Sequence, residues 1–122
     1  MKKFFLYLLP VLIYAGIIFY FSSLSNVGIS LSFDSDDLSL HSLEYIGFGF
    51  LIHRLLVNSK LKHTAKIIIL ISLCISVLYG LSDEIHQGFV PKRTPSLVDL
   101  IADSFGALVG ILIYQKLKSI RK

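Results

Sequence analysis

Residues 65–93 read AKIIILISLCISVLYGLSDEIHQGFVPKR, a long apolar run that ends in a short polar stretch. The run from Ala65 to Leu81 carries no charge after Lys66, and as a helix it would span about 25 Å at 1.5 Å per residue. Five ionisable residues then follow within the eleven positions 83–93. Polar groups at the end of a membrane-length segment are costly and are therefore candidates for function. We predict a spanning helix whose last turn carries a functional site.

The composition extends this prediction to the whole chain. The 122 residues are 54% hydrophobic and 16% charged, with a mean hydropathy of +0.73. An ordinary soluble domain has roughly 25% charged residues, and a soluble chain this short could not bury so much apolar surface. Apolar runs of about spanning length lie near residues 4–21, 43–57, 65–81 and 97–115. We therefore predict an all-α, four-helix transmembrane bundle that forms a single domain over residues 1–122.

The first apolar run is predicted to remain as a spanning helix. It is longer than the 7–15 residues of a signal-peptide core, and residues 22–25 offer no small-x-small cleavage site. Cys74 is the only cysteine and lies in the middle of the third run, so the chain has no intrachain disulfide. We assign this thiol to helix packing.

The basic residues are distributed unevenly around the predicted spans. With Lys2 and Lys3 inside, four spans leave both termini in the cytoplasm and only Lys92 and Arg93 outside. This distribution predicts a multi-pass membrane protein with membrane lipids as partners, and it leaves little of the +4 charge for nucleic-acid binding. The basic residues on the inner side are Lys2, Lys3, Arg54, Lys60, Lys62, Lys66, Lys116, Lys118, Arg121 and Lys122.

Polar residues gather at the predicted outer ends of three helices. His41 and Glu44 are three positions apart and therefore share a helical face. Ser96 and Asp99 form a variant of a capping box, whereas Asp103 lies one turn deeper, where capping cannot explain it. Short connections keep consecutive helices adjacent, so we expect these ends to converge. The set comprises His41, Glu44, Asp83, Glu84, His86, Gln87, Asp99 and Asp103, with Lys92 and Arg93 in the loop between the last two helices.

Several kinds of chemistry fit this set. Imidazole and carboxylate could hold a divalent metal, with His41, Glu84 and His86 as its ligands, although no compact motif such as H-E-x-x-H is present. The carboxylates could instead act as general acid and base with a histidine, or the polar groups could simply bond the helices together. Arg93, Lys92 and two helix N-termini would suit a phosphate or pyrophosphate, unless Arg93 only neutralises the carboxylates.

Three further features predict structure more than chemistry. The serine- and aspartate-rich stretch 22–40 is interpreted as a solvated connector, with a lid over the site or a cation-attracting surface as the alternatives. His53 and His63 are expected to contact solvent or the membrane surface on the inner side. Residues 106–110 form a small-xxx-small surface, for which packing within the chain is favoured over dimerisation.

Residues 82–93, followed by Ser96, Asp99, Asp103, Gly106 and Gly110, closely resemble the signature of VanZ-like membrane proteins. The stretch His41-Ser42-Leu43-Glu44-Tyr45 resembles the second motif of that family, and the resemblance covers nearly the whole chain. The resemblance implies a multi-pass protein of the bacterial cytoplasmic (inner) membrane in which the motif residues form one polar site. The family name refers to reduced sensitivity to the glycopeptide teicoplanin, but the resemblance does not define a biochemical activity. Leu38 stands where the family often has a lysine, which weakens any role that requires a cation beside His41.

We therefore expect an outward-facing pocket that binds or acts on a lipid-linked, phosphate-containing component of the cell envelope, with a possible influence on glycopeptide sensitivity. The alternatives are a non-catalytic lipid- or antibiotic-binding protein and a small transporter or flippase component, although the apolar middle of the first and third runs counts against transport. Turnover, oligomeric state and the presence of a divalent metal stay open. The predicted catalytic residues are Asp83, Glu84, His86, His41 and Glu44, and the predicted substrate-binding residues are Arg93, Gln87, Lys92, Asp99, Asp103 and Tyr45.

Overall fold

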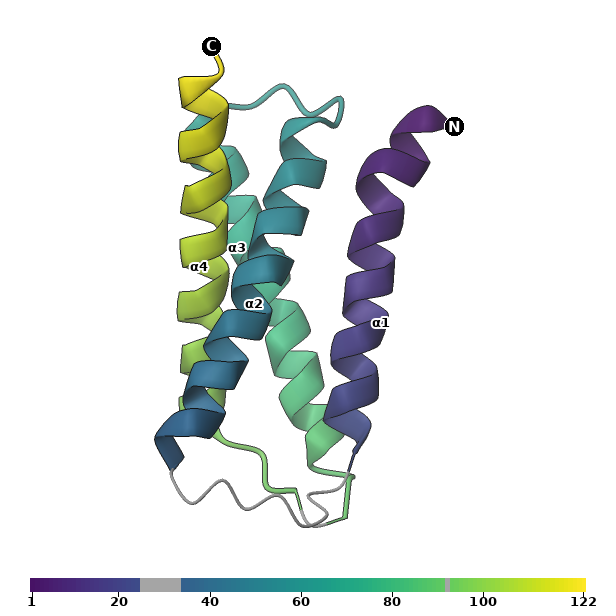
Figure 1. The fold of residues 1–122 in the computed structure, drawn as a ribbon, viewed down its shortest axis with the longest axis vertical. Coiled ribbons are helices and arrows are strands. Elements are labelled where there is room, and N and C mark those ends of the chain that lie inside the picture. The colour runs from purple at the N-terminus through teal and green to yellow at the C-terminus, as the bar shows by residue number, and fades with distance from the viewer. Residues whose placement is uncertain (25–33, 92) are drawn as a thin grey trace.

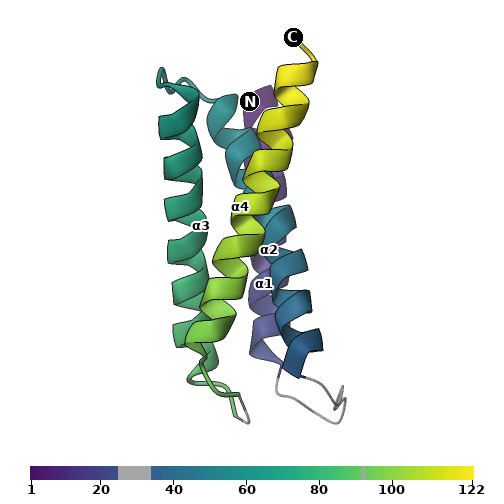
Figure 2. The same ribbon diagram turned by 90° about the vertical axis from the view of Figure 1, so that its left-hand side faces the viewer.

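A computed structural model describes residues 1–24, 34–91 and 93–122, with the backbone alone at residues 34–39. In this part of the chain, four antiparallel helices and no strands are present, which confirms the predicted all-α bundle (Figure 1). Both termini lie at one end, here called the terminal end (Figures 1 and 2). The helices are α1 (Leu9–Ser23), preceded by a π-helical turn η1 (Phe4–Leu8), α2 (Asp34–Val57), α3 (Ala65–Gln87) and α4 (Leu97–Ile120). The end of the bundle opposite the termini, here called the site end, holds the ends of α1 and α3 and the starts of α2 and α4.

The largest difference from the sequence-based boundaries concerns α2, which begins at Asp34 and not near residue 43. Three aspartates stand within residues 34–37, and acidic residues favour the first turn of a helix because its amide dipoles point there. A hydropathy profile does not register this preference of acidic residues for a helix start. The predicted connector over residues 22–40 is therefore wrong for residues 34–40, and also for Ser22 and Ser23, which belong to α1. Residues 25–33 of it lie outside the described part of the chain.

Three helical segments are long and apolar enough to cross a membrane: Phe4–Ser23, Ala65–Gln87 and Leu97–Ile120. Large apolar side chains such as Leu78 and Phe105 are exposed on these helices, where lipid would cover them. The chain is thus a multi-pass membrane protein. α2 has comparable length, but it contains more polar residues and is not among the helices of the described chain that are apolar enough to span. A fourth span at residues 43–57 therefore stays a prediction.

Helices α2 and α4 pack backbone against backbone. A methyl group on Gly110 would collide with the Ile46 carbonyl, and one on Gly106 would collide with the Ser42 carbonyl. Gly49 of α2 faces the backbone of Ala107 in the same way. The glycines permit this close approach because they have no side chain, as in other small-xxx-small interfaces. The prediction that residues 106–110 serve packing within the chain is confirmed.

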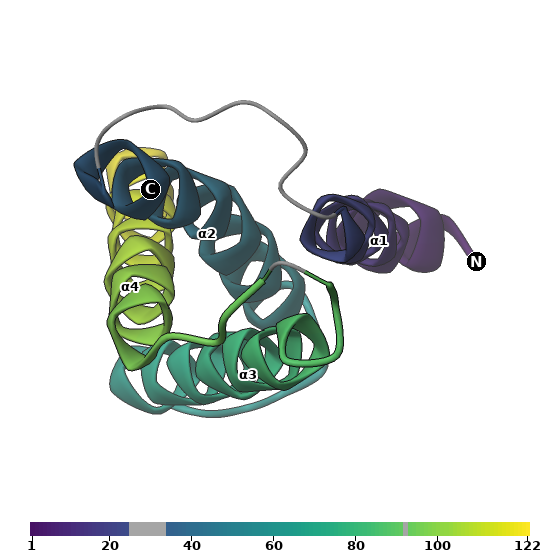
Figure 3. The ribbon, with the colours of Figure 1, turned by 90° about the horizontal axis from the view of Figure 1, so that it is seen from below.

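Helix α1 stands apart from the triangle that α2, α3 and α4 form when the bundle is viewed from the site end (Figure 3). Hydrogen bonds to backbone carbonyls attach it to the other helices. The Tyr14 hydroxyl donates to the Glu44 carbonyl at 2.7 Å, and the Tyr79 hydroxyl donates to the Ala15 carbonyl at 2.6 Å. Near the terminal end, Arg54 donates to the Leu6 carbonyl at 2.9 Å. Each such bond stabilises a fold by about 1 kcal/mol. These bonds add to apolar packing, because Val11 and Ile18 of α1 are buried in one core cluster with Phe48 of α2.

The prediction that His53 contacts solvent or the membrane surface is wrong, because this side chain is fully buried between α3 and α4. Its Nδ1 lies 2.8 Å from Ser72 Oγ, and its Nε2 lies 3.0 Å from Gln115 Oε1. Ser72 and Ser76 are also buried, so the inward face of α3 carries polar groups at its middle, where the sequence was expected to be apolar. His63 is exposed as predicted. Cys74 is exposed on α3, so its assignment to helix packing is wrong.

Candidate functional site

Part of the residue set predicted from the sequence lines a cavity of about 410 Å³ at the site end, here called the site pocket. Helix α2 contributes His41 and Glu44, and α3 contributes Asp83 and Gln87, which are one turn apart. Arg93 from the loop before α4 completes the polar wall. Phe21 and Leu40 add apolar surface, and Ser22 adds a hydroxyl from α1. Five predicted site residues therefore share one cavity.

A second group, here called the His41 cluster, consists of His41, Glu84 and Asp103. One nitrogen or oxygen atom from each residue lies within 4.8 Å of the others. His41 Nδ1 lies 3.1 Å from Asp103 Oδ1. The three side chains are 7%, 5% and 1% exposed, respectively. His41 also lines the site pocket, so the cluster and the pocket share a side chain.

The packing of α2 on α4 explains why His41 meets Asp103. His41 precedes Ser42, whose backbone contacts Gly106, and Asp103 lies three residues before Gly106. Close approach of these two backbones therefore brings the imidazole and the carboxylate together. Ser42 Oγ reinforces this contact by donating to the Ala102 carbonyl at 3.2 Å.

Glu84 connects the end of α3 to the start of α4. Its Oε2 accepts a hydrogen bond from the backbone N–H of Ser96 at 2.9 Å. Ser96 Oγ in turn accepts from the backbone N–H of Asp99 at 3.4 Å, so Ser96 caps α4 as predicted. The start of α4 thus already faces a carboxylate of the chain itself. A bound anion would compete with Glu84 for that helix end.

Arg93 stands at the junction of the site pocket and α1. Its Nε donates to the Leu24 carbonyl at 2.9 Å, and its Nη2 donates to the Phe21 carbonyl at 3.3 Å. Within the described residues the guanidinium forms no ion pair with a carboxylate, and these bonds use only part of its five N–H donors. Its positive charge is therefore available to a ligand in the pocket.

His86 does not join the His41 cluster. Its Nε2 lies 2.9 Å from Ser23 Oγ, and its ring stacks on Phe19 with centroids 4.4 Å apart. The reason is helical geometry, because Glu84 and His86 are two positions apart and point in different directions. Of the three side chains expected as metal ligands, the structure brings His41 and Glu84 together, with Asp103 and not His86 as the third member of the group.

Three of the predicted substrate-binding residues that the structure describes do not line the site pocket: Tyr45, Asp99 and Asp103, the last of which belongs to the His41 cluster. Tyr45 is fully buried, and its hydroxyl has no hydrogen-bond partner among the described residues. Asp99 lies in the first turn of α4, beside the cap. Lys92 lies outside the described residues.

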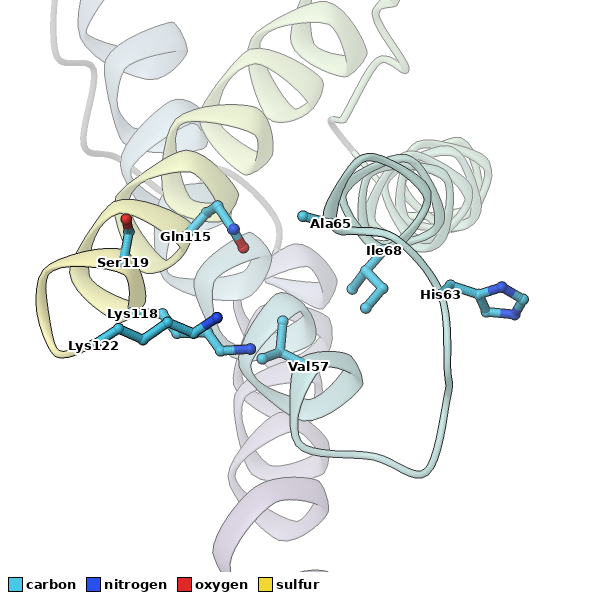
Figure 4. A pocket seen from close by; sticks show the side chains of 8 residues that line it. All are labelled: Val57, His63, Ala65, Ile68, Gln115, Lys118, Ser119 and Lys122. Atoms are coloured by element: carbon cyan, nitrogen blue, oxygen red, sulfur yellow. The ribbon is translucent and has the colours of Figure 1, made fainter.

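No site at the terminal end is predicted from the sequence, and Ser22 and Ser23 are not among the predicted site residues. Both serines directly follow the first apolar run, and that position could have identified them as neighbours of the motif. At the terminal end, a cavity of about 280 Å³ lies beside Gln115 and Lys118. Figure 4 shows Lys118 and Lys122 extending from α4 toward the end of α2, whereas His63 points away on the far side.

Comparison with known families gives one match: the VanZ/LLP1 family over residues 4–119. No curated protein and no solved structure is significantly similar to the chain. The matched range includes all four helices almost completely, together with the site pocket and the His41 cluster.

Proposed function

The chain belongs to the VanZ/LLP1 family, and from this membership and the geometry of the site end we propose that it binds the phosphate-containing head of a membrane-anchored lipid in the site pocket. The observation that carries the proposal is the position of Arg93. It supplies a guanidinium without a carboxylate partner among the described residues, at the wall of a cavity between membrane-spanning helices. Guanidinium groups bind phosphate oxygens with paired, charge-assisted hydrogen bonds.

The surroundings of the pocket support an amphiphilic ligand. The cavity volume of about 410 Å³ is within the range of small-ligand sites and suits a phosphate or pyrophosphate head. Phe21 and Leu40 line it, and Phe89 and Leu97 are exposed at the same end of the bundle. A polar head held by the pocket would thus leave its apolar tail beside apolar side chains and lipid.

Glu44 and Asp83 determine what the pocket could do beyond binding. A carboxylate beside a phosphate must carry a proton or share a cation with it, since like charges repel at short distance. A protonated carboxyl group would donate a hydrogen bond to the phosphate and could act as a general acid. The same two residues, with His41, are our candidates for acid and base in any turnover of the head group.

Arg93→Ala is expected to weaken binding of a polyprenyl monophosphate by roughly 10- to 100-fold, because a hydrogen bond to a charged group contributes about 1.5–3 kcal/mol. Native mass spectrometry of the purified full-length protein in detergent would measure this binding. The corresponding polyprenol, which lacks the phosphate, should bind weakly to the wild type and show little change in the variant.

Arg54→Ala is a matched control, because Arg54 also donates to a backbone carbonyl of the N-terminal helical segment, but at the terminal end. It should retain polyprenyl phosphate binding. Equal affinity of wild type and Arg93→Ala for the phosphate, or equal loss in both variants, would contradict the proposal.

We further propose that the site end faces the outside of the cytoplasmic membrane and that both termini are cytoplasmic. In a Cys74→Ser background, Thr94→Cys should react with a membrane-impermeant maleimide in intact cells. Lys122→Cys should react only after the membrane is disrupted. Both positions are exposed, and they lie at opposite ends of the bundle. The reverse labelling pattern would show that the topology is inverted, with the site end in the cytoplasm. The internal geometry of the site would be the same in either orientation.

A further inference from the structure

We propose that His41, Glu84 and Asp103 bind a divalent transition-metal ion. The three residues come from α2, α3 and α4, and their candidate ligand atoms lie within 4.8 Å of one another. His41 Nδ1 and Asp103 Oδ1 are 3.1 Å apart, close to the separation of roughly 3.3 Å expected for two ligands on one tetrahedral zinc ion. This inference goes beyond lipid binding and does not depend on the identity of the lipid.

Two buried carboxylate oxygens provide an independent observation. Glu84 Oε1 and Asp103 Oδ2 have no hydrogen-bond partner among the described residues. Their side chains are only 5% and 1% exposed. A buried carboxylate oxygen without a partner is costly, and a purely structural network between helices would be expected to satisfy both atoms. A cation between the three side chains would supply the missing interaction for each oxygen.

The charges of the cluster favour a divalent ion. Two carboxylates and a neutral imidazole together carry a charge of −2, which one divalent cation would neutralise. This neutralisation would remove the main cost of holding two acidic groups close together in an apolar bundle.

The donor types favour a transition metal over calcium or magnesium. Imidazole together with carboxylate suits ions such as Zn²⁺ and Mn²⁺, whereas Mg²⁺ and Ca²⁺ prefer ligands that are all oxygen. Glu84 is also oriented for this role, because its Oε2 is held by the backbone N–H of Ser96 at 2.9 Å. Three protein ligands would leave a coordination position for a water molecule or a phosphate oxygen, and His41 already joins the cluster to the site pocket.

The metal content of the purified protein tests this proposal directly. The full-length protein would be purified in detergent, stripped with EDTA, dialysed against ZnCl₂ or MnCl₂, and analysed by inductively coupled plasma mass spectrometry. We expect about one ion per wild-type chain with at least one of the two metals. We also expect that metal to raise the thermal unfolding midpoint, because it binds only the folded state.

Asp103→Asn and Glu84→Gln should each lose at least about 10-fold in metal affinity and most of the thermal shift, because each removes a charged ligand at nearly constant volume. Asp99→Asn removes a carboxylate from the same helix one turn earlier, and His63→Gln removes an exposed imidazole. Both controls should bind metal like the wild type. Circular dichroism would verify that all variants are helical.

The wild-type measurement alone can overturn the proposal. Absence of bound zinc and manganese, together with an unchanged unfolding midpoint after stripping, would show that the cluster is not a metal site. Wild-type affinity in Asp103→Asn, or an equal loss in Asp99→Asn, would reject the assigned ligands. No lipid is added, so failure here would leave the Arg93 experiment to decide the proposed lipid binding separately.

Discussion

Gly110→Leu is expected to lower the free energy of unfolding by about 3–5 kcal/mol, the upper range for a single substitution. A Cβ at this position would collide with the Ile46 carbonyl and lie 2.9 Å from the backbone nitrogen of Phe50. These atoms belong to the backbone of α2, so they cannot move aside by a change of rotamer. The two helices would have to separate. Denaturation of the purified protein in detergent, followed by circular dichroism, would measure the loss.

Gly16→Leu provides the matched control, because a Cβ at Gly16 would have no neighbouring atom within 4 Å. It should change the free energy of unfolding by less than about 1 kcal/mol. Similar losses for the two variants would mean that close packing of α2 on α4 does not stabilise the fold. The same α2–α4 contact positions His41 beside Asp103, so Gly110→Leu should also reduce metal binding by the His41 cluster.

His53→Ala is expected to cost about 3 kcal/mol of unfolding free energy. The substitution opens a cavity at a fully buried position and removes the hydrogen-bond partner that His53 provides to Gln115. The same denaturation measurement applies. His63→Ala should change the free energy of unfolding by less than about 0.5 kcal/mol, because His63 is exposed at the same end.

A double-mutant cycle separates the hydrogen bond from the cavity. Gln115→Leu combined with His53→Ala should be less destabilising than the sum of the two single variants, by about 1 kcal/mol. Strict additivity would mean that the contact of 3.0 Å between Nε2 and Oε1 contributes nothing to stability.

Patterns of apolar and small residues predicted the parts of this fold that depend on local chemistry. The apolar run from Ala65 was expected to continue as a helix through the acidic pair, and α3 does extend to Gln87. The small residues at 106–110 were correctly interpreted as a contact surface. The start of α2 was missed because hydropathy does not register aspartates that favour a helix N-terminus.

Only part of the candidate site could be predicted from sequence patterns. Residues such as Asp83 and Arg93 could be recognised because charged groups beside membrane-length segments are rare. The side chains that contact them from other helices could not be assigned. Sequence spacing shows which residues share a face of one helix, but it does not show how that helix is rotated about its axis relative to the others. His86 therefore entered the predicted metal set, although in the folded chain it stacks on Phe19 of α1.

The sequence by itself determined that this chain is a multi-helix membrane protein of the VanZ/LLP1 family with a polar site beside residues 83–93. Lipid as a solvent requires long apolar helices, and that requirement is visible in composition alone. Only the tertiary structure decided that Asp103 accompanies His41 and Glu84, that Arg93 joins α1 to the site pocket, and that His53 is buried. These choices depend on which helical faces meet, and the backbone contacts at Gly106 and Gly110 set that rotation for α2 and α4.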